Sequence, residues 1–443
     1  MKTLKTRIYS ICAMALLLIL ASCQGRVKLT VLGEDSSNLQ AMAALKSEYE
    51  RENNIKIVFH PNTFEDAWNK SIQDFRHGTG LYDIVLQYNF SLSTFVRNGY
   101  VYCIDDLLDM MDPKPNTSFE QDLFQKAWKE VGWYYKDPSN PNSDEIQKIG
   151  YPFAINTMLL TYNKKMFEDQ DMQRAYKAKY GEDLVVPTTW EQFRNIAEFF
   201  TTSNTYGICM QGAEGGWLYY EYCNYLYGMD GSVFDKTRGW EGTLYTPMTI
   251  TSPEAVAATK FYRSLKPFNK GNYTTVDATE QIRLLQEGNV AMGIVWSDYL
   301  YEFDKYGENF GFAPIPGNKS AIAGGSFYVN KNSKNPQEAI KYIMHLMQPK
   351  MQIELAKRGL SSPLKSTYND PEVQKISYSN ALKTSLERGV YMFEAGIEAE
   401  IVSQVITNHI QRLWRNDNLK VEDVLEQIKQ EIDAGRKEAH KNL

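Results

Sequence analysis

The sequence is poor in the residues that build metal centres and disulfide scaffolds. It has five histidines and five cysteines among 443 residues, and the histidines are scattered along the chain. Cys12 and Cys23 lie near the amino terminus, which leaves Cys103, Cys209 and Cys223 for the body of the protein. An odd number of thiols cannot pair fully, so a disulfide-stapled scaffold is excluded. A bond between Cys209 and Cys223 stays open, beside the alternative that all three are buried free thiols.

Positive charge is also in short supply. The chain carries 48 basic and 54 acidic residues, for a net charge of −6, and has no long basic tract. Nucleic acids and anionic lipids bind to basic patches, so neither is an expected partner.

Enzyme signatures are missing as well. The sequence has no G-x-S-x-G elbow, no phosphate-binding glycine loop and no H-E-x-x-H motif. We therefore expect no catalytic residue, no cofactor and no metal, although a glycosidase can hide its carboxylate pair from the sequence. Aromatic residues, in contrast, are abundant, with 29 tyrosines and 8 tryptophans. Most must pack in cores, but a sugar-binding cleft would also use them.

Long apolar runs are absent except for one near the amino terminus. A short basic region precedes an apolar run over residues 11–21, which is too short to span a bilayer. The run ends in L-A-S-C at Cys23, and small residues directly before a cysteine resemble the lipobox of bacterial lipoproteins. The resemblance implies that residues 1–22 are a signal peptide and that acylated Cys23 anchors an extracytoplasmic protein to the cell envelope. The alternative is an ordinary signal peptide that contains a cysteine.

The first part of the body alternates between two kinds of hydrophobic periodicity. The pattern predicts strands over residues 27–32, 55–59 and 82–86, and helices over 37–53 and 64–75. Such alternation indicates βαβ units and a mainly parallel sheet. Ligands of open α/β sheets bind outside the carboxyl ends of strands, so we expect a ligand near loops 33–38, 61–63 and 87–90.

A second α/β region follows the turn-rich stretch 137–144 and begins near Tyr151. Helical spacing recurs over residues 190–200, 253–265, 278–286, 336–347 and 401–414. Ser252 and Asn335 each precede a proline at a first-turn position, so both are expected to cap a helix.

Five segments of the chain match the motifs of a known family, in the same order. They are G-Y-P-F-A-I-N-T-M-L-L-T-Y-N-K (150–164), P-T-T-W-E-Q-F (187–193), L-Q-E-G-N-V-A-M-G (285–293), F-G-F-A-P-I-P-G (310–317) and N-K-N-S-K-N-P-Q-E-A (330–339). On these segments the chain resembles the family 1 extracellular solute-binding proteins, the receptors of carbohydrate ABC importers.

The resemblance implies a fold of the type II periplasmic-binding-protein class, with two α/β lobes, a hinge and a ligand cleft between them. Lobe 1 would comprise residues 26–153 and 309–347, and lobe 2 residues 157–305 and 349–443. Extended segments at Pro152 and before Pro314 suit a hinge, which needs a few crossing segments that absorb dihedral change.

The resemblance also implies a role: a monomer that binds a sugar or oligosaccharide and delivers it to the permease subunits of an ABC importer. The alternative keeps the fold but serves a membrane sensor, or stands alone as a surface glycan-binding lipoprotein. The expected ligand loops lack a cluster of basic residues, which favours a neutral sugar over an anionic ligand.

Candidate binding residues in the first region follow from the strand ends. Glu34 and Asp35 follow the first strand, beside serines that are expected to cap the next helix. Gln87 and Asn89 follow the third strand. Asp83, within that strand, is expected to bind backbone amides or the ligand.

The resemblance supplies candidates in the remainder of the chain. It places Asn156 at the crossover between the lobes, Trp296 beneath a sugar ring, with lobe 2 core as its alternative, and Asp298 two residues later. Gly325 and Ser326 would bring backbone amides to the ligand.

The aromatic segment that follows Gly215 and Gly216 adds further candidates, because glycine lets the backbone turn sharply there. At least one of Trp217, Tyr219 and Tyr220 is expected to stack on the ligand, and we select Trp217 and Tyr220.

Overall fold

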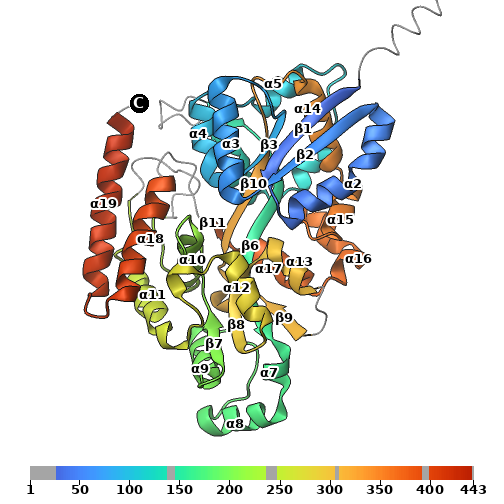
Figure 1. The fold of residues 1–443 in the computed structure, drawn as a ribbon. Coiled ribbons are helices and arrows are strands. Elements are labelled where there is room, and N and C mark those ends of the chain that lie inside the picture. Colours follow the sequence, from blue (N-terminus) through green and yellow to red (C-terminus); the bar gives the residue numbers. More distant parts are fainter. Residues whose placement is uncertain (1–25, 137–144, 236–246, 305–308, 392–398, 442–443) are drawn as a thin grey trace, which may run out of the picture.

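The computed structural model describes residues 26–136, 145–235, 247–304, 309–391 and 399–441. Cys23, the predicted signal peptide and the turn-rich stretch 137–144 lie outside these residues. The described chain forms two α/β lobes, one above the other in Figure 1, and the central strands run from one lobe into the other.

The first lobe is built on the βαβ units that the sequence predicts. Strand β1 (Val27–Glu34) pairs in parallel with β2 (Ile55–Asn62) and with β3 (Ile84–Tyr88), and helices α2 (Ser37–Asn53) and α3 (Phe64–His77) connect them. The predicted range of α2 is confirmed. The carboxyl ends of β1 and β3 therefore lie at one edge of the sheet.

The centre of the sheet is antiparallel, so the expectation of a mainly parallel sheet is wrong there. Strand β10 (Ala321–Val329) runs antiparallel to β3 and to β6 (Tyr151–Asn163). It returns to the first lobe only after the chain has passed through the second lobe, rather than through a single crossover helix. The resulting order is β2-β1-β3-β10-β6-β8-β7.

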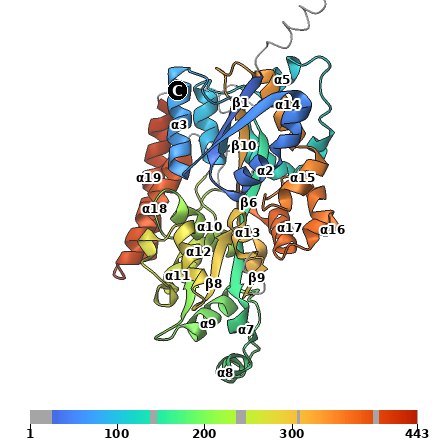
Figure 2. The same ribbon diagram turned by 45° about the vertical axis from the view of Figure 1, so that its right-hand side comes forward.

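Strand β6 belongs to both lobes (Figure 2). Its first half pairs with β10, and its second half pairs antiparallel with β8 (Val290–Trp296) and β9 (Phe310–Ala313). Strand β7 (Tyr206–Cys209) then adds to β8 in parallel. Asn156 lies where the pairing of β6 changes from one lobe to the other.

Helices cover the sheet in both lobes. Those on the first lobe are α4 (Leu92–Arg97), α5 (Ile104–Asp109), α6 (Gln125–Gly132) and α14 (Pro336–Leu346). Near the junction lie α13 (Leu300–Asp304), α15 (Pro349–Ala356), α16 (Pro371–Gln374) and α17 (Ser379–Arg388). Those on the second lobe are α7 (Lys164–Glu168), α8 (Gln170–Tyr180), α9 (Trp190–Phe200), α10 (Trp217–Gly228), α11 (Pro253–Ser264), α12 (Ala278–Gln286), α18 (Ala399–Arg415) and α19 (Val421–Lys441).

Three short strands complete the described elements. Strands β4 (Trp133–Tyr135) and β5 (Ile146–Lys148) form a separate antiparallel pair, and β11 (Val390–Tyr391) pairs with β10.

Helix capping follows the sequence at some positions and departs from it at others. The Ser252 side chain accepts a hydrogen bond from the backbone N–H of Ala255, as predicted. Asn335 makes no capping bond; its amide instead lies 3.4 Å from a carboxylate oxygen of Asp83. Neither Ser36 nor Ser37 caps α2 with its side chain.

The first lobe has its own apolar core. Leu29, Ile57 and Leu86 of the sheet pack with residues of α14 and with Leu355 and Leu360. These last two residues come after position 349, where the sequence predicts that the chain returns to lobe 2. The lobe boundaries themselves stay a prediction.

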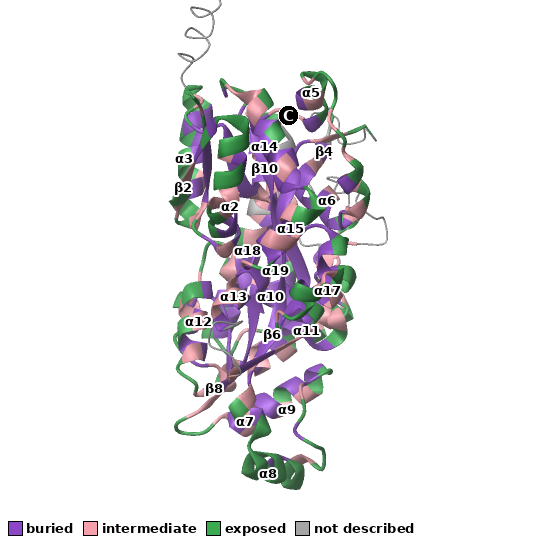
Figure 3. Cartoon of the chain, turned by 90° about the vertical axis from the view of Figure 1, so that its right-hand side faces the viewer, coloured by how far each residue is buried: buried purple, intermediate pink, exposed green. Residues whose placement is uncertain are grey.

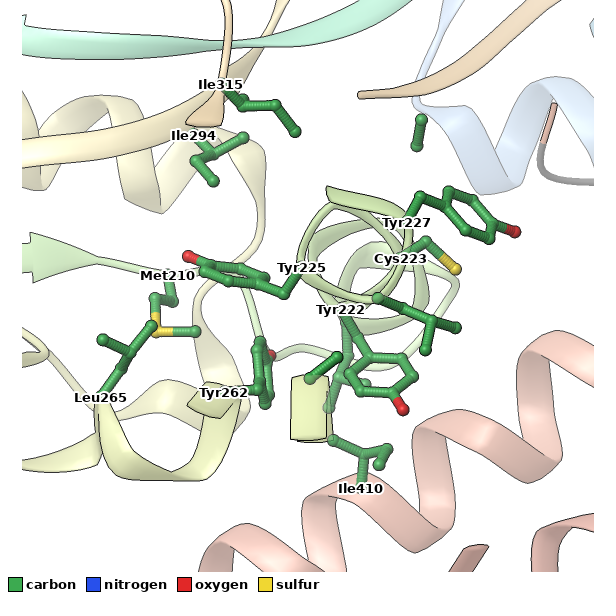
Figure 4. Packing of buried hydrophobic residues seen from close by; sticks show 14 of the residues in the cluster. Met210, Tyr222, Cys223, Tyr225, Tyr227, Tyr262, Leu265, Ile294, Ile315 and Ile410 are labelled. Carbon is green, nitrogen blue, oxygen red and sulfur yellow. The ribbon is translucent and has the colours of Figure 1, made fainter. Parts of the chain in front are cut away.

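The core of the second lobe surrounds helix α10. Tyr222, Tyr225 and Tyr227 project from different sides of this helix, among Tyr262 and Ile410 of neighbouring helices (Figure 4). A helix that is apolar all round is a buried helix. The N-terminus of α10 is thereby held in place, and it points toward the first lobe.

Burial follows this layout (Figure 3). Buried residues run along the central strands, whereas a helix such as α8, which buries only Tyr176, is exposed over most of its surface. None of the helices in the described ranges combines the length and the apolarity that a bilayer span requires.

Candidate functional site

A cavity lies at the junction of the two lobes. Its lining combines aromatic rings with two acids and one amide. The lining residues are Glu34, Phe64, Tyr88, Asn156, Gly215, Trp217, Tyr220, Trp296, Asp298, Tyr299 and Ala323.

Strand ends position most of this lining. Glu34 is the last residue of β1, Tyr88 the last of β3 and Trp296 the last of β8. Phe64 opens α3, directly after β2. The site therefore lies outside the carboxyl ends of strands, where ligands of open α/β sheets bind.

The N-terminus of α10 supplies the aromatic face of the second lobe. Gly215 and Gly216 have φ values of 81° and 100°, which favour glycine, and they turn the chain into the helix. Trp217 and Tyr220 line the cavity, because residues three apart share a helix face. Tyr219 lies on another face of the helix and is fully buried in the core. Of the three aromatic candidates, Trp217 and Tyr220 therefore line the cavity and Tyr219 does not.

A carboxylate from the first lobe is held by two phenols. The Tyr88 hydroxyl donates a hydrogen bond to Glu34, and the Tyr299 hydroxyl, from beyond β8, donates another. Burial nevertheless raises the pKa of Glu34 above its ordinary value, and the nearby charge of Asp35 adds to the rise.

A second carboxylate comes from the second lobe. Asn156 Nδ2 donates a 3.1 Å hydrogen bond to Asp298 Oδ2. Burial, followed by the negative charge of Glu34, raises the pKa of Asp298 to about 7. Glu34 is therefore close enough to disfavour the ionised form of Asp298.

Three buried polar atoms of the lining have no hydrogen-bond partner among the described residues. They are Asn156 Oδ1, Trp296 Nε1 and Asp298 Oδ1, and each belongs to a side chain that is at most 7% exposed. A buried polar group without a partner costs about 1–3 kcal/mol. Donors and acceptors supplied by a ligand would satisfy all three.

Aromatic rings from the two lobes meet across the cavity. The rings of Phe64 and Trp217 are 6.2 Å apart, and Tyr220 contacts Trp296 edge to face at 5.0 Å. Flat rings of this kind bind the apolar C–H faces of sugars or a cationic group.

An adjoining cavity extends the site toward α18. The two cavities share Phe64, Gly215 and Tyr220. The polar face of α18 adds Ser403, Gln404, Thr407 and Asn408, which lie one turn apart in pairs. The Thr407 hydroxyl is another buried group for which the described chain provides no partner.

The structure places five of the predicted residues outside the first cavity. Asp35 is exposed and accepts a hydrogen bond from Gln40, and Gln87 is buried on the opposite face of β3 from Tyr88. Asn89 donates to Glu130. On β10 a Cβ at Gly325 would clash with Phe153, and the buried Ser326 hydroxyl donates to the carbonyl of Val131.

The other six predicted residues, Glu34, Asn156, Trp217, Tyr220, Trp296 and Asp298, line the cavity. Sequence reasoning missed Phe64, Tyr299 and Ala323 and did not select Tyr88. Strand alternation was the available signal for Tyr88, because a strand that ends in a cleft presents every second side chain to it. Binding by any of these residues remains a prediction.

Two other expectations concern residues away from the cavity. Asp83 is a structural carboxylate: it accepts hydrogen bonds from the backbone N–H of Thr30 and from Ser333. Cys103, Cys209 and Cys223 form no disulfide among the described residues, so Cys209 and Cys223 are not bonded to each other.

Together these features describe a two-lobed protein with a candidate ligand site between the lobes. Comparison with known proteins identifies its family. The sequence signature of bacterial extracellular solute-binding proteins matches residues 44–378, and the chain belongs to this family. The predicted family and the type II periplasmic-binding-protein fold are thereby confirmed. The chain is therefore a solute-binding protein, not an enzyme, and the proteins of this family are extracellular.

A curated relative and two solved structures illustrate the similarity. The chain is 20% identical to a probable amino-acid ABC transporter periplasmic-binding protein of Sinorhizobium fredii, over 86% of this chain and 83% of the relative. A solute-binding protein of Thermotoga lettingae bound to α-D-tagatose has a TM-score of 0.76 at 18% identity, covering 92% of this chain and 99% of that one. The acarbose receptor GacH of Streptomyces glaucescens has a TM-score of 0.74 at 18% identity, covering 93% and 98%.

Proposed function

We propose that this protein captures a sugar or oligosaccharide in the cavity between its lobes and delivers it to the permease subunits of an ABC importer. The observation that carries the proposal is the pairing of aromatic rings with unpartnered buried polar atoms in one cavity. A sugar needs both, since its hydroxyls require donors and acceptors and its C–H faces require flat apolar surfaces.

The energetics suit a receptor of ordinary affinity. A micromolar receptor needs about −8 kcal/mol. Hydrogen bonds to Asn156, Trp296 and Asp298 would each contribute about 1 kcal/mol, and stacking on Trp217 or Tyr220 about 1 kcal/mol more. Burial of the remaining sugar surface supplies the rest, offset by the cost of association.

The adjoining cavity supports a ligand longer than one sugar ring. Its hydroxyls and amides on α18 are groups that bind sugar hydroxyls, and its shared wall places them next to the first ring. A disaccharide or longer chain would reach Thr407 and Asn408, whereas a monosaccharide would leave them to water.

The name of the curated relative raises an amino acid as another ligand. The carboxylate of an amino acid is normally bound by arginine, lysine or a group of backbone donors. No Arg, Lys or His is among the described residues that line either cavity. A saccharide therefore fits the lining better.

A thermal-shift screen tests the proposal. Purified protein is heated with each member of a panel of mono- and oligosaccharides and, in parallel, of amino acids. Ligand at a hundred times its Kd stabilises the folded state by about 2.7 kcal/mol, so a true ligand raises the melting temperature. A rise with a saccharide supports the proposal, and a rise with amino acids alone contradicts it.

We further propose that Cys23 carries a lipid anchor, as its lipobox-like context indicates. Two or three acyl chains hold a protein to a membrane almost permanently. Wild type should partition with detergent-phase membrane proteins after cell fractionation, and Cys23→Ala should lose this partitioning. Equal membrane retention of both proteins contradicts the anchor.

A further inference from the structure

The cavity holds more acidic groups than a neutral sugar requires. Glu34 enters from β1 in the first lobe and Asp298 from beyond β8 in the second, and both line the same space. Glu130 lies near enough to Tyr220, and Asp277 near enough to Tyr299, for their charges to act on those phenols. Two further acids therefore lie near rings of the cavity wall.

No lysine, arginine or histidine of the described chain pairs with Glu34 or Asp298. The pKa of Glu34 is set by burial, by hydrogen bonds from two tyrosines and by the charge of Asp35. The pKa of Asp298 is set by burial, by the charge of Glu34 and by a backbone hydrogen bond. No lysine, arginine or histidine is among these groups. The lining of both cavities contains no basic residue within the described ranges. Buried carboxylates are normally paired with a cation, and unpaired ones are costly.

The hydrogen-bond donors around the two acids do not satisfy them fully. Asp298 is 7% exposed, and its Oδ1 atom lines the cavity without a partner among the residues described. Its Oδ2 atom accepts a hydrogen bond from the side-chain amide of Asn156. An acceptor is thus left facing the ligand.

The rest of the wall also suits a positive charge. Six aromatic residues line the cavity, Phe64, Tyr88, Trp217, Tyr220, Trp296 and Tyr299. The faces of aromatic rings attract a cation within about 6 Å of their centres, tryptophan most strongly. Rings that enclose a site with a free carboxylate form the usual receptor for an ammonium group.

We propose that the ligand is a sugar that carries a protonated amine, and that the amine lies between Glu34 and Asp298 against the aromatic wall. This inference rests on the proposed function and specifies its ligand class. The sugar hydroxyls would bind Asn156 and Trp296, and the positive charge of the ammonium would balance the negative charge of the two acids when they are ionised.

The test compares amino sugars with matched neutral sugars by calorimetric titration. The probes are glucosamine, galactosamine and mannosamine, their N-acetyl forms, the parent hexoses, and the disaccharide of glucosamine with its N-acetylated form. Putrescine and choline are included as simple amines. At least one free amine should bind tenfold or more tightly than both of its neutral counterparts. Equal or tighter binding of the neutral counterparts overturns the inference, as does a panel in which no amino sugar binds.

Isosteric variants locate the effect. Glu34→Gln and Asp298→Asn keep size and hydrogen-bonding capacity but remove charge, so each should reduce the preference for the amine by tenfold or more. Glu65→Gln removes an exposed charge beside Phe64 and serves as the matched control, with an unchanged preference. A preference that survives in both site variants overturns the placement of the amine.

A pH series adds an independent readout. Burial and the charge of Glu34 raise the pKa of Asp298 to about 7, so ionisation of Asp298 increases between pH 5 and 7. An amine of the sugar stays largely protonated over this interval. Affinity for the amino sugar should rise several-fold from pH 5 to 7, and the rise should be smaller in Asp298→Asn. A flat profile in wild type contradicts the inference.

The outcomes separate this inference from the proposed function. Binding of neutral sugars alone defeats the inference and leaves sugar capture standing. Binding of simple amines such as putrescine or choline, with no sugar bound at all, defeats the proposed function and leaves only a site that binds organic cations.

Discussion

The hydroxyl of Ser37 donates a 2.7 Å hydrogen bond to the backbone carbonyl of Asp298. This bond joins the start of helix α2 in the first lobe to the segment that follows β8 in the second. A second carbonyl, that of Gly359, lies 3.1 Å from the same hydroxyl. Because Ser37 does not line the cavity, the bond links the lobes without contacting the ligand.

Removal of this hydrogen bond should destabilise the closed state of the protein and so weaken ligand binding. Ser37→Ala loses one partly buried hydrogen bond, worth about 1 kcal/mol, which corresponds to about a fivefold rise in Kd. A ligand favours the closed state only by its differential affinity for it, so the loss should appear mainly as faster dissociation. Stopped-flow fluorescence measures it. An unchanged dissociation rate would show that the bond does not contribute to closure.

The indole N–H of Trp296 is predicted to donate to the ligand. Trp296→Phe keeps an aromatic ring and removes the donor, so it should raise the Kd of the bound sugar by about tenfold or less. Trp190 offers a matched control, since its Nε1 is also buried without a partner among the described residues but lies in the core away from both cavities. Calorimetry of Trp190→Phe should give the wild-type Kd. Equal losses in both variants would indicate a general effect on packing.

Neighbouring rings on α10 should differ sharply in their effect on binding. Trp217→Ala removes a ring from the cavity wall and should cost about 1–2 kcal/mol of binding free energy. Tyr219→Phe changes a ring that points into the core and should leave the Kd unchanged while it lowers stability slightly. Paired titrations of the two variants check this helix-face argument. An unchanged Kd in Trp217→Ala would remove the ring from the site.

Stability should fall as the pH rises through the neutral range. Glu221 is fully buried in α10, and burial raises its pKa from 4.5 to about 8, against the weaker effect of a hydrogen bond from Tyr225. The folded state therefore holds a proton that the unfolded chain releases near pH 4.5. The contribution is fully present below that pH and is lost between about pH 4.5 and 8, by an amount on the order of a few kcal/mol.

Substitution of this acid should flatten the profile. Glu221→Gln stays uncharged, so its free energy of unfolding should exceed that of wild type at pH 8 and match it near pH 4.5. A residual slope from Asp298, whose pKa is also raised, should persist. Glu182→Gln, at an exposed position, should follow the wild-type curve. Urea denaturation at four pH values measures these differences, and parallel curves for wild type and Glu221→Gln contradict the assignment.

Much of the fold could be read from the sequence because local periodicity and burial agree. The ranges predicted for α2, α9 and α12 are those observed, since each helix has an apolar face that packs on the sheet. The antiparallel position of β10 could not be read, because a strand that is buried on both sides has the same composition in either direction. Its partners are set by the return of the chain from the second lobe.

The candidate site could be predicted only where the backbone direction was clear. Gly215 and Gly216 let the backbone turn sharply, so the sequence predicted that at least one of the aromatic residues after them would reach the site. Gln87 and Tyr88 are neighbours on β3 and point to opposite faces of the sheet. A one-residue error in the predicted register exchanges the two faces. The phenol of Tyr299 reaches Glu34 from the other lobe, and no local pattern records such a contact.

Solution scattering with and without a saturating sugar tests the central claim most directly. The described structure has its lobes in contact across the cavity, through Phe64 and Trp217. The account predicts that the free protein has a larger radius of gyration, and that the bound sugar shifts the profile to the one expected for this structure. A sugar that raises the melting temperature without compaction, or that is chemically converted during the measurement, would contradict it.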